Sequence, residues 1–270
     1  MRICLINFDA LWKDKEANIR QKKILIEQAL EHERETDIIV FPELSLTGYV
    51  LDSDATILAE ERDGDSIKKI AELAREYSVA IIFGFIERNT EGKPYNSVAV
   101  ISNTGELITT YRKHHLFSQG KEVQIYTPGD TLSIFELAWV RCGISICFDL
   151  RYPRLYEAYK KAWVECIFTS AAWVDGRNKP DIFRSLSKAR SGENQIFMAS
   201  VDCIWQDENN AYAGNAIISN PYSEDIRKTY DGIFHFWTID TSIITDLSAN
   251  MLLSSGYRDT YTITSARETL

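Results

Sequence analysis

Long apolar runs, paired cysteines and metal-binding motifs are all missing from this sequence of 270 residues. No segment approaches the roughly 20 consecutive apolar residues that a membrane-spanning helix needs. No Cys-x-x-Cys motif or Cys/His cluster occurs, which disfavours a structural zinc site. The five cysteines are odd in number and scattered through apolar segments, so they predict reduced thiols and a cytoplasmic protein.

Proline and positive charge are also sparse. With 6 prolines and no linker-like stretch, the chain is predicted to fold as one domain over residues 1–270. The 30 basic residues are outnumbered by 39 acidic ones, and the net charge of −9 disfavours a nucleic-acid or anionic-membrane partner. The N-terminal apolar run is too short for a signal peptide and lacks a cleavage site, so we expect a first strand there.

Apolar periodicity, in contrast, is abundant. Short apolar runs typical of buried strands alternate with stretches whose apolar residues recur at helical spacing, a pattern that predicts an α/β protein. A turn signal at Asn103-Thr104-Gly105 joins two runs as a hairpin, so the sheet must contain antiparallel neighbours. Beyond the first strand we expect strands at 38–41, 79–85, 97–101, 107–111, 131–136, 137–147, 164–170, 195–201, 213–219 and 232–240, and helices at 19–35, 64–74, 153–162 and 180–190.

The apolar pattern weakens beyond Thr245. Apolar residues such as Leu252 and Tyr257 are mixed there among polar ones, which favours packing on a neighbouring subunit over packing in the core. Residues 245–270 are therefore predicted to form a C-terminal tail that contacts a partner subunit.

A cysteine lies where one buried run ends. Ile144 and Ile146 are typical of a strand, and Cys147 follows them just before a polar stretch that begins with Asp149. A thiol at such a strand-to-helix turn can face a cleft as a nucleophile. Free cysteines are, however, among the most buried residues, so a core position is the alternative. A nucleophile also needs a base and a donor for the oxyanion.

Candidates for the base and the donor occur earlier in the chain. Glu43 ends a buried strand as Cys147 does, so it should project at the same rim of the sheet, where partial burial raises the pKa of a carboxylate and suits it to act as a base. Lys113 follows the hairpin and can point the same way. The alternatives are a solvated surface glutamate and a solvated basic loop.

Three sequence blocks occur in one order along the chain: Phe-Pro-Glu at 41–43, Tyr-Arg-Lys-x-His-Leu at 111–116 and Ile-Cys-Phe-Asp-x-Arg-Tyr-Pro at 146–153. Together they resemble the signature blocks of the nitrilase, or carbon-nitrogen hydrolase, superfamily. The resemblance implies a four-layer α-β-β-α sandwich of two mixed sheets flanked by helices, which pairs into a homodimer or larger homo-oligomer. It also implies catalysis by Glu43, Lys113 and Cys147 without a cofactor or metal. Stretches 126–130, 189–194 and 214–221 extend the resemblance over nearly the whole chain.

The implied chemistry is a two-step acyl transfer. A free thiol has a pKa of about 8.5 and is mostly protonated at neutral pH, so Glu43 would remove the proton of Cys147. The thiolate would attack an amide carbonyl, and the oxyanion would lie between the Lys113 ammonium and the backbone N–H of Phe148. Glu43 would protonate the leaving ammonia and then activate water to hydrolyse the thioester.

Three further residues have two interpretations each. Glu122 resembles a further family glutamate that orients Lys113 or the substrate amide, but a loop salt bridge to Lys121 or another neighbour is as probable for an exposed charge. Trp173 resembles a residue lining the substrate cleft, or it is a core or dimer contact. Arg151 is suited to pair with a substrate carboxylate, or it forms a structural ion pair.

Some positions depart from the family pattern. Arg154 stands where many members have a glutamate, and the stretch from Gly214 to Ser223 lacks one serine and the final glycine of that pattern. The overall resemblance and Arg151 favour a dicarboxylate monoamide such as 2-oxoglutaramate as the substrate of an omega-amidase-like enzyme. An N-carbamoyl-amide hydrolase, a nitrilase and a catalytically silent dimeric scaffold are the alternatives. Regulation by oxidation of Cys147 is a further hypothesis.

Overall fold

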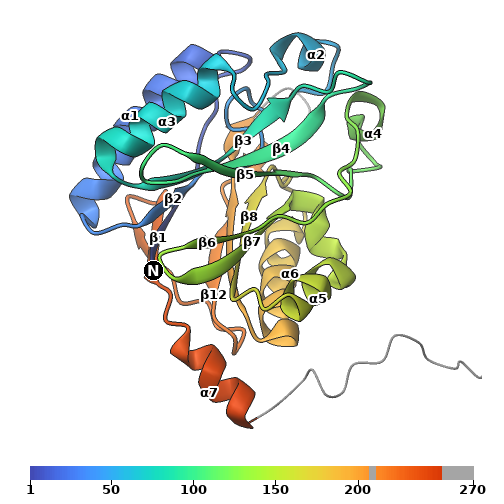
Figure 1. Cartoon of the computed structure of the whole chain (residues 1–270). Coiled ribbons are helices and arrows are strands. Elements are labelled where there is room, and N and C mark those ends of the chain that lie inside the picture. Colours follow the sequence, from blue (N-terminus) through green and yellow to red (C-terminus); the bar gives the residue numbers. More distant parts are fainter. Residues whose placement is uncertain (207–210, 251–270) are drawn as a thin grey trace, which may run out of the picture.

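The computed structural model describes residues 1–206 and 211–250 (Figure 1). Most of the tail that was expected to contact a partner subunit, residues 251–270, lies outside this part of the chain. The beginning of that tail belongs to helix α7 (Ser242–Asn250), in which Leu247 is buried within the chain itself. In the part of the chain that the structure describes, no helix combines the length and the apolar character needed to cross a membrane.

Two mixed β-sheets lie at the centre of the molecule (Figure 1). The strand order is β13-β14-β1-β2-β3-β4-β5 in the larger sheet and β12-β9-β8-β7-β6 in the smaller one, and β10 and β11 form a separate hairpin. The strands are β1 (Arg2–Ile6), β2 (Ile38–Val40), β3 (Ala80–Glu87), β4 (Tyr95–Ile101), β5 (Leu107–Arg112), β6 (Ile134–Leu137), β7 (Val140–Ile146), β8 (Cys166–Ala171), β9 (Phe197–Asp202), β10 (Ile204–Gln206), β11 (Ala211–Ala213), β12 (Ala216–Ser219), β13 (Lys228–Tyr230) and β14 (Phe234–Thr238).

Helices cover the outer face of each sheet (Figure 1). The larger sheet is covered by α1 (Lys15–His32) and α3 (Asp65–Tyr77), and the smaller one by α5 (Pro153–Lys161) and α6 (Lys179–Asn194). This arrangement confirms the predicted α-β-β-α sandwich. The remaining helical segments are α2 (Asp54–Leu58), α4 (Glu122–Ile125) and a 3₁₀ helix (Cys147–Arg151).

Strand β1 shows why strands of these sheets appear in the sequence as continuous apolar runs. Ile3 and Leu5 face the core between the two sheets, whereas Cys4 and Ile6 face the core under α1 and α3. Because both faces of the strand are covered, neither set of alternating residues can be polar. A buried strand of this kind is recognisable from sequence even without apolar–polar alternation.

Residues 137–147 were expected to form one strand, and this prediction was wrong at its beginning. Ala138 and Trp139 both have positive φ values, 46° and 65°, so they form the tight turn between β6 and β7. Two-residue turns in which both residues have positive φ match the twist of a hairpin, and they usually contain Asn or Gly. This turn contains neither residue, so the sequence held no indication of it.

The strands bring the candidate site residues to one rim. Strands β1, β2 and β3 run parallel, as do β7, β8 and β9, and β5 runs in the direction of β3 because both pair antiparallel with β4. Glu43, Lys113, Cys147 and Trp173 each follow the carboxyl end of one of these strands. Ligand sites in open α/β sheets lie at this end of the strands.

Candidate active site

Glu43 is buried in the loop after β2, with 2% of its surface exposed. Its Oε1 accepts hydrogen bonds from Lys113 Nζ and from Asn96 Nδ2, each at 2.7 Å. Its Oε2 accepts the backbone N–H of Ala172 at 2.7 Å. Three donors from three different strand ends therefore fix the position of this carboxylate.

Two backbone features accompany the close contact between the Glu43 loop and β3. A Cβ atom at Gly84 would lie 2.1 Å from the backbone nitrogen of Leu44, so only glycine permits this close approach. Leu44 itself has a φ of 45°, a left-handed conformation that is rare for a bulky residue. Strained backbone of this kind is concentrated at functional sites.

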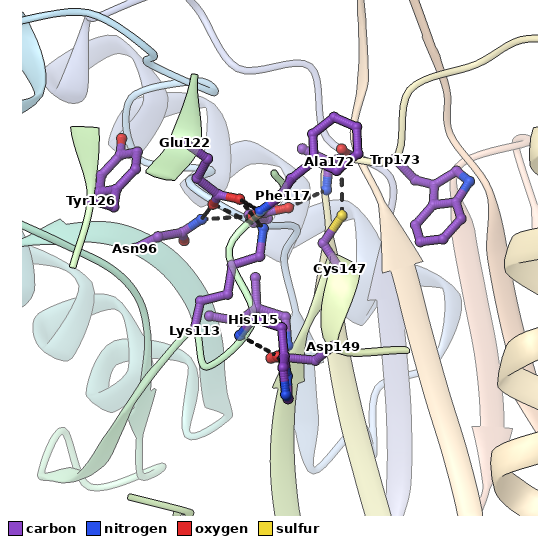
Figure 2. A network of polar contacts seen from close by, with 12 residues as sticks. Asn96, Lys113, His115, Phe117, Glu122, Tyr126, Cys147, Asp149, Ala172 and Trp173 are labelled. Atoms are coloured by element: carbon purple, nitrogen blue, oxygen red, sulfur yellow. Dashed lines mark hydrogen bonds and ion pairs between the residues drawn. The ribbon is translucent and has the colours of Figure 1, made fainter. Parts of the chain in front are cut away.

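Lys113 is fully buried and pairs with two glutamates, Glu43 and Glu122, the second of which is labelled in Figure 2. Besides Glu43, its ammonium donates to Oε1 and Oε2 of Glu122, both at 2.9 Å. Asn96 Nδ2 also donates to Glu122 Oε1, at 2.8 Å. Glu122 is thus paired with the buried Lys113 and not with Lys121, and the basic run around Lys113 is not a solvated loop at this position.

Burial and charge shift the pKa values of this group in opposite directions. Burial raises the pKa of Glu43 above its ordinary value, although the nearby Lys113 ammonium acts against the shift. Burial would lower the pKa of Lys113, but the carboxylates of Glu122 and Glu43 more than offset it and raise the pKa well above its ordinary value. Lys113 therefore stays charged at neutral pH, and Glu43 is suited to exchange a proton.

Cys147 begins the 3₁₀ helix directly after β7 and has a φ of 45°. Its Sγ lies 3.6 Å from the carbonyl oxygen of Ala172, the residue whose N–H binds Glu43 (Figure 2). Within the described residues, Sγ makes no direct hydrogen bond to Glu43 or Lys113. Burial and the nearby Glu43 carboxylate raise the pKa of the thiol well above its ordinary value, so it needs a base to become a nucleophile.

The backbone N–H of Phe148 is available beside this thiol. Phe148 is the second residue of the 3₁₀ helix, where an N–H has no acceptor within the helix. No other acceptor within the described residues takes it up. The N–H is therefore free to stabilise negative charge next to Sγ.

Asp149 fixes the turn that carries this thiol (Figure 2). Its Oδ2 accepts the N–H of Ile146 at 2.9 Å and the hydroxyl of Tyr111 at 2.8 Å. Its Oδ1 accepts the N–H of His115 at 2.9 Å and lies 2.7 Å from the ring Nδ1 of the same residue. The buried carboxylate therefore ties the 3₁₀ helix to the loop that begins with Lys113.

Replacing Asp149 by asparagine is expected to lower kcat roughly tenfold to hundredfold with little change in KM. Each oxygen of Asp149 faces two donor groups, and the asparagine side chain replaces one oxygen by an NH₂ group, which cannot accept from them. The turn that carries Cys147 is therefore expected to shift relative to Lys113. Steady-state kinetics with a urea unfolding curve check this. The exposed Asp130→Asn is the control, and an unchanged kcat in Asp149→Asn would show that the contact is purely structural.

A cavity of about 40 Å³ opens above Cys147. Its walls include the aromatic rings of Tyr49, Phe117, Phe148 and Trp173. Trp173 lines this cavity and also packs against the core through Phe183, with ring centroids 5.6 Å apart, while its contact with a substrate stays a prediction. A small apolar cavity of this kind accommodates a short aliphatic chain next to the thiol.

Arg151 borders the same cavity. Its guanidinium carbon lies 5.1 Å from the centre of the Trp173 ring and 5.8 Å from that of Phe148. No carboxylate among residues 1–206 and 211–250 lies within ion-pairing distance of it. The structural ion pair considered for Arg151 is therefore not present in this part of the chain.

Sequence reasoning missed Asn96 and Tyr49. The side-chain amide of Asn96 bridges the two glutamates, and its only sequence signal is a polar residue that begins an apolar strand. Tyr49 follows the Glu43 block and offered no signal beyond that proximity. Within the described ranges, no group of three or more His, Cys, Asp or Glu side chains is arranged to hold a metal ion.

Comparisons with known proteins show the family of the chain. A family model described as carbon-nitrogen hydrolase matches residues 2–231. The 2-oxoglutaramate amidase of Bacillus subtilis (strain 168) is 31% identical over 221 residues, which cover 82% of this chain and 83% of that protein. The omega-amidase NIT2 of Bos taurus is 32% identical over 179 residues, which cover 63% of this chain and 64% of that protein.

The fold has solved counterparts as well. The crystal structure of Nit3 from Saccharomyces cerevisiae, described as a member of branch 10 of the nitrilase superfamily, superimposes with a TM-score of 0.84. It is 20% identical, and the match covers 94% of this chain and 95% of that one. Because the family model spans most of the sequence, the chain belongs to the carbon-nitrogen hydrolase family of enzymes.

Proposed function

We propose that the protein hydrolyses a small linear amide through a thioester on Cys147, with Glu43 as the general base. The observation that carries this proposal is the pair of contacts at Ala172, whose N–H binds Glu43 and whose carbonyl oxygen contacts the Cys147 thiol. The two side chains are thus neighbours across one residue. Hydrogen bonds between catalytic groups are often long before substrate binds and tighten in the complex.

In the first half of the reaction, Glu43 removes the proton of Cys147 and the thiolate attacks the amide carbon. The oxyanion lies between the Lys113 ammonium and the N–H of Phe148. Glu43 then gives its proton to the amide nitrogen, the C–N bond breaks, and ammonia leaves a thioester behind. Glu122 and Asn96 hold the lysine and Glu43 in place.

In the second half, Glu43 takes a proton from water, and the hydroxide attacks the thioester carbonyl. The same two donors stabilise the oxyanion. The C–S bond breaks, the acid leaves, and the proton held by Glu43 returns to the Cys147 thiolate. One carboxylate therefore serves both halves, which requires a pKa above that of an ordinary glutamate.

For the substrate we propose an amide that also carries a carboxylate. Two of the similar proteins are named 2-oxoglutaramate amidase and omega-amidase, and 2-oxoglutaramate is an amide of this kind. Arg151 supports this class, because a guanidinium beside the cavity has no carboxylate partner among the described residues. Arginine binds carboxylates with two parallel hydrogen bonds, which fixes the orientation of the substrate.

A panel of small compounds tests the proposal by the ammonia they release. It should contain carboxylate-bearing amides, neutral amides of equal length, N-carbamoyl amides and nitriles. Release from the carboxylate-bearing amides with the highest kcat/KM supports the proposal. Preference for a carbamoyl compound or a nitrile would reassign the substrate, and release from none would favour a non-catalytic scaffold.

The pH dependence of kcat/KM offers a further prediction. Activity requires ionised Glu43, and burial raises its pKa, so activity should fall with decreasing pH at a midpoint above the ordinary glutamate value of about 4.3. A pH series over a range in which the protein stays folded checks this. A midpoint at or below that ordinary value would argue against Glu43 as the base.

A further inference from the structure

Two charged residues are among those that line the cavity above Cys147, and both are cations. They are Arg151 and Lys179, the first residue of α6. The other lining residues among the described ones are aromatic, aliphatic or the thiol itself. In a chain with a net charge of −9, a cavity whose lining among the described residues has two cations and no acidic group is unexpected by composition.

Neither cation is neutralised by a carboxylate of the residues that the structure describes. No carboxylate within residues 1–206 and 211–250 lies within 4.0 Å of Lys179 or Arg151, whereas nearby Asp181 pairs with Arg184. Arg151 is exposed and Lys179 is half-buried, so both charges are accessible to an anion that enters from solution. The cavity is therefore complementary to a ligand that combines a short aliphatic chain with a negative charge.

Trp173 contacts both of the residues that carry these charges. Its indole N–H donates to the carbonyl oxygen of Lys179 at 3.0 Å, which anchors the start of α6 at the cavity. The guanidinium of Arg151 lies 5.1 Å from the centre of the same ring. Lys179 is only half-buried, and the flexible stem of a lysine lets its ammonium reach an anion that Arg151 binds.

We propose that Lys179 is a specificity-determining residue that binds the substrate carboxylate together with Arg151. The substrate class is then a monoamide of a short dicarboxylic acid, whose amide carbon reaches Cys147 while its carboxylate stays at the rim. This inference rests on the proposed amide hydrolysis and adds a second cationic contact to it. The cavity is small and lined mostly by aromatic side chains, which favours a short aliphatic chain.

The test compares Lys179→Met with the native protein on two amides of equal length, succinamate and the neutral butanamide. We expect KM for succinamate to rise about tenfold in the variant, because a hydrogen bond to a charged group is lost, while KM for butanamide stays unchanged. Added salt should raise KM for succinamate in the native protein and have less effect in the variant.

Lys188→Met is the matched control, since Lys188 is a half-buried lysine of the same helix that does not line the cavity. It should leave both KM values unchanged. In the double variant Lys179→Met with Arg151→Met, the two KM effects on succinamate should not multiply independently, because one carboxylate bridges both groups.

Three results would overturn the inference. Equal changes in KM for succinamate and butanamide in Lys179→Met would show that Lys179 has only a structural role. An unchanged KM for succinamate in that variant would show that Lys179 does not contact the substrate. Either result leaves the proposed amidase function intact. Failure of the native protein to hydrolyse any amide would overturn the proposed function and this inference with it.

Discussion

Replacement of Cys147 by alanine is expected to abolish amide hydrolysis, with a loss of about 10⁶-fold in kcat, the scale seen when a hydrolase loses its nucleophile. The substitution removes Sγ, which makes one weak hydrogen bond within the described residues, to the carbonyl oxygen of Ala172. The fold should therefore remain. Ammonia release measured beside a thermal unfolding curve separates loss of chemistry from loss of structure.

Cys203→Ala is the matched control for this prediction. Both thiols are buried, with 7% of Cys147 and 8% of Cys203 exposed, and both are free. Because no step uses Cys203, the control should retain activity. Hydrolysis by Cys147→Ala at a rate close to that of the native protein would show that Cys147 is not the nucleophile.

Replacement of Lys113 by methionine is expected to damage both activity and stability. Loss of an oxyanion donor costs about 10²–10³-fold in kcat. The substitution also leaves Glu43 and Glu122 buried without a counter-charge, and breaking a buried ion pair in this way costs about 3–5 kcal/mol of unfolding free energy. Steady-state kinetics and urea unfolding measure the two effects separately.

The stability loss in Lys113→Met should depend on pH. Without the ammonium, burial and the neighbouring Glu122 carboxylate raise the folded-state pKa of Glu43 further, so the variant gains stability relative to the native protein as pH falls through that pKa. In the native protein, the raised pKa of Lys113 adds stability that is present below the unfolded value, about 10.4, and is lost only as pH rises through the folded one. A deficit independent of pH would argue against two uncompensated carboxylates.

Lys22→Met provides a contrasting control for stability. Lys22 is also fully buried, but its ammonium binds the carbonyl of Ser45 and lies over the rings of Phe8 and Phe41. No carboxylate is left unpaired when it is removed. We therefore expect a much smaller loss of stability than in Lys113→Met, even though both substitutions remove one buried lysine.

The layered fold could be predicted because its cause is local. Strands such as β1 and β2 are apolar on both faces, which identifies them as buried, and Gly105 at the β4–β5 turn reveals the antiparallel neighbours. The turn at Ala138 and Trp139 could not be found, because neither residue favours positive φ and only the pairing of β6 with β7 imposes it.

The site could be predicted only in part. Glu43, Lys113 and Cys147 were found because each follows a strand in a recognisable block. The pairing of Lys113 with Glu122 was one of two interpretations of Glu122, and the sequence could not decide between them, because the pairing depends on the tertiary position of α4. Asn96 was missed for the same reason, since its importance lies in two carboxylates that come from elsewhere in the chain.

The pocket residues show where sequence spacing is insufficient. Arg151 follows Cys147 by four residues, so its proximity to the thiol was predictable, but the absence of an ion pair at the described residues became visible only in the structure. Lys179 lies far from Cys147 in the sequence and reaches the same cavity only because Trp173 binds its carbonyl oxygen. Both assignments depend on tertiary structure.

Mass spectrometry of the protein quenched in acid during turnover tests the central proposal most directly. With succinamate in excess, the peptide that contains Cys147 should gain the mass of the substrate minus ammonia, and the adduct should disappear once substrate is exhausted. Peptides that contain Cys203 should stay unmodified. Continued ammonia release without any adduct on Cys147, or with the adduct on another residue, would contradict covalent catalysis by this thiol.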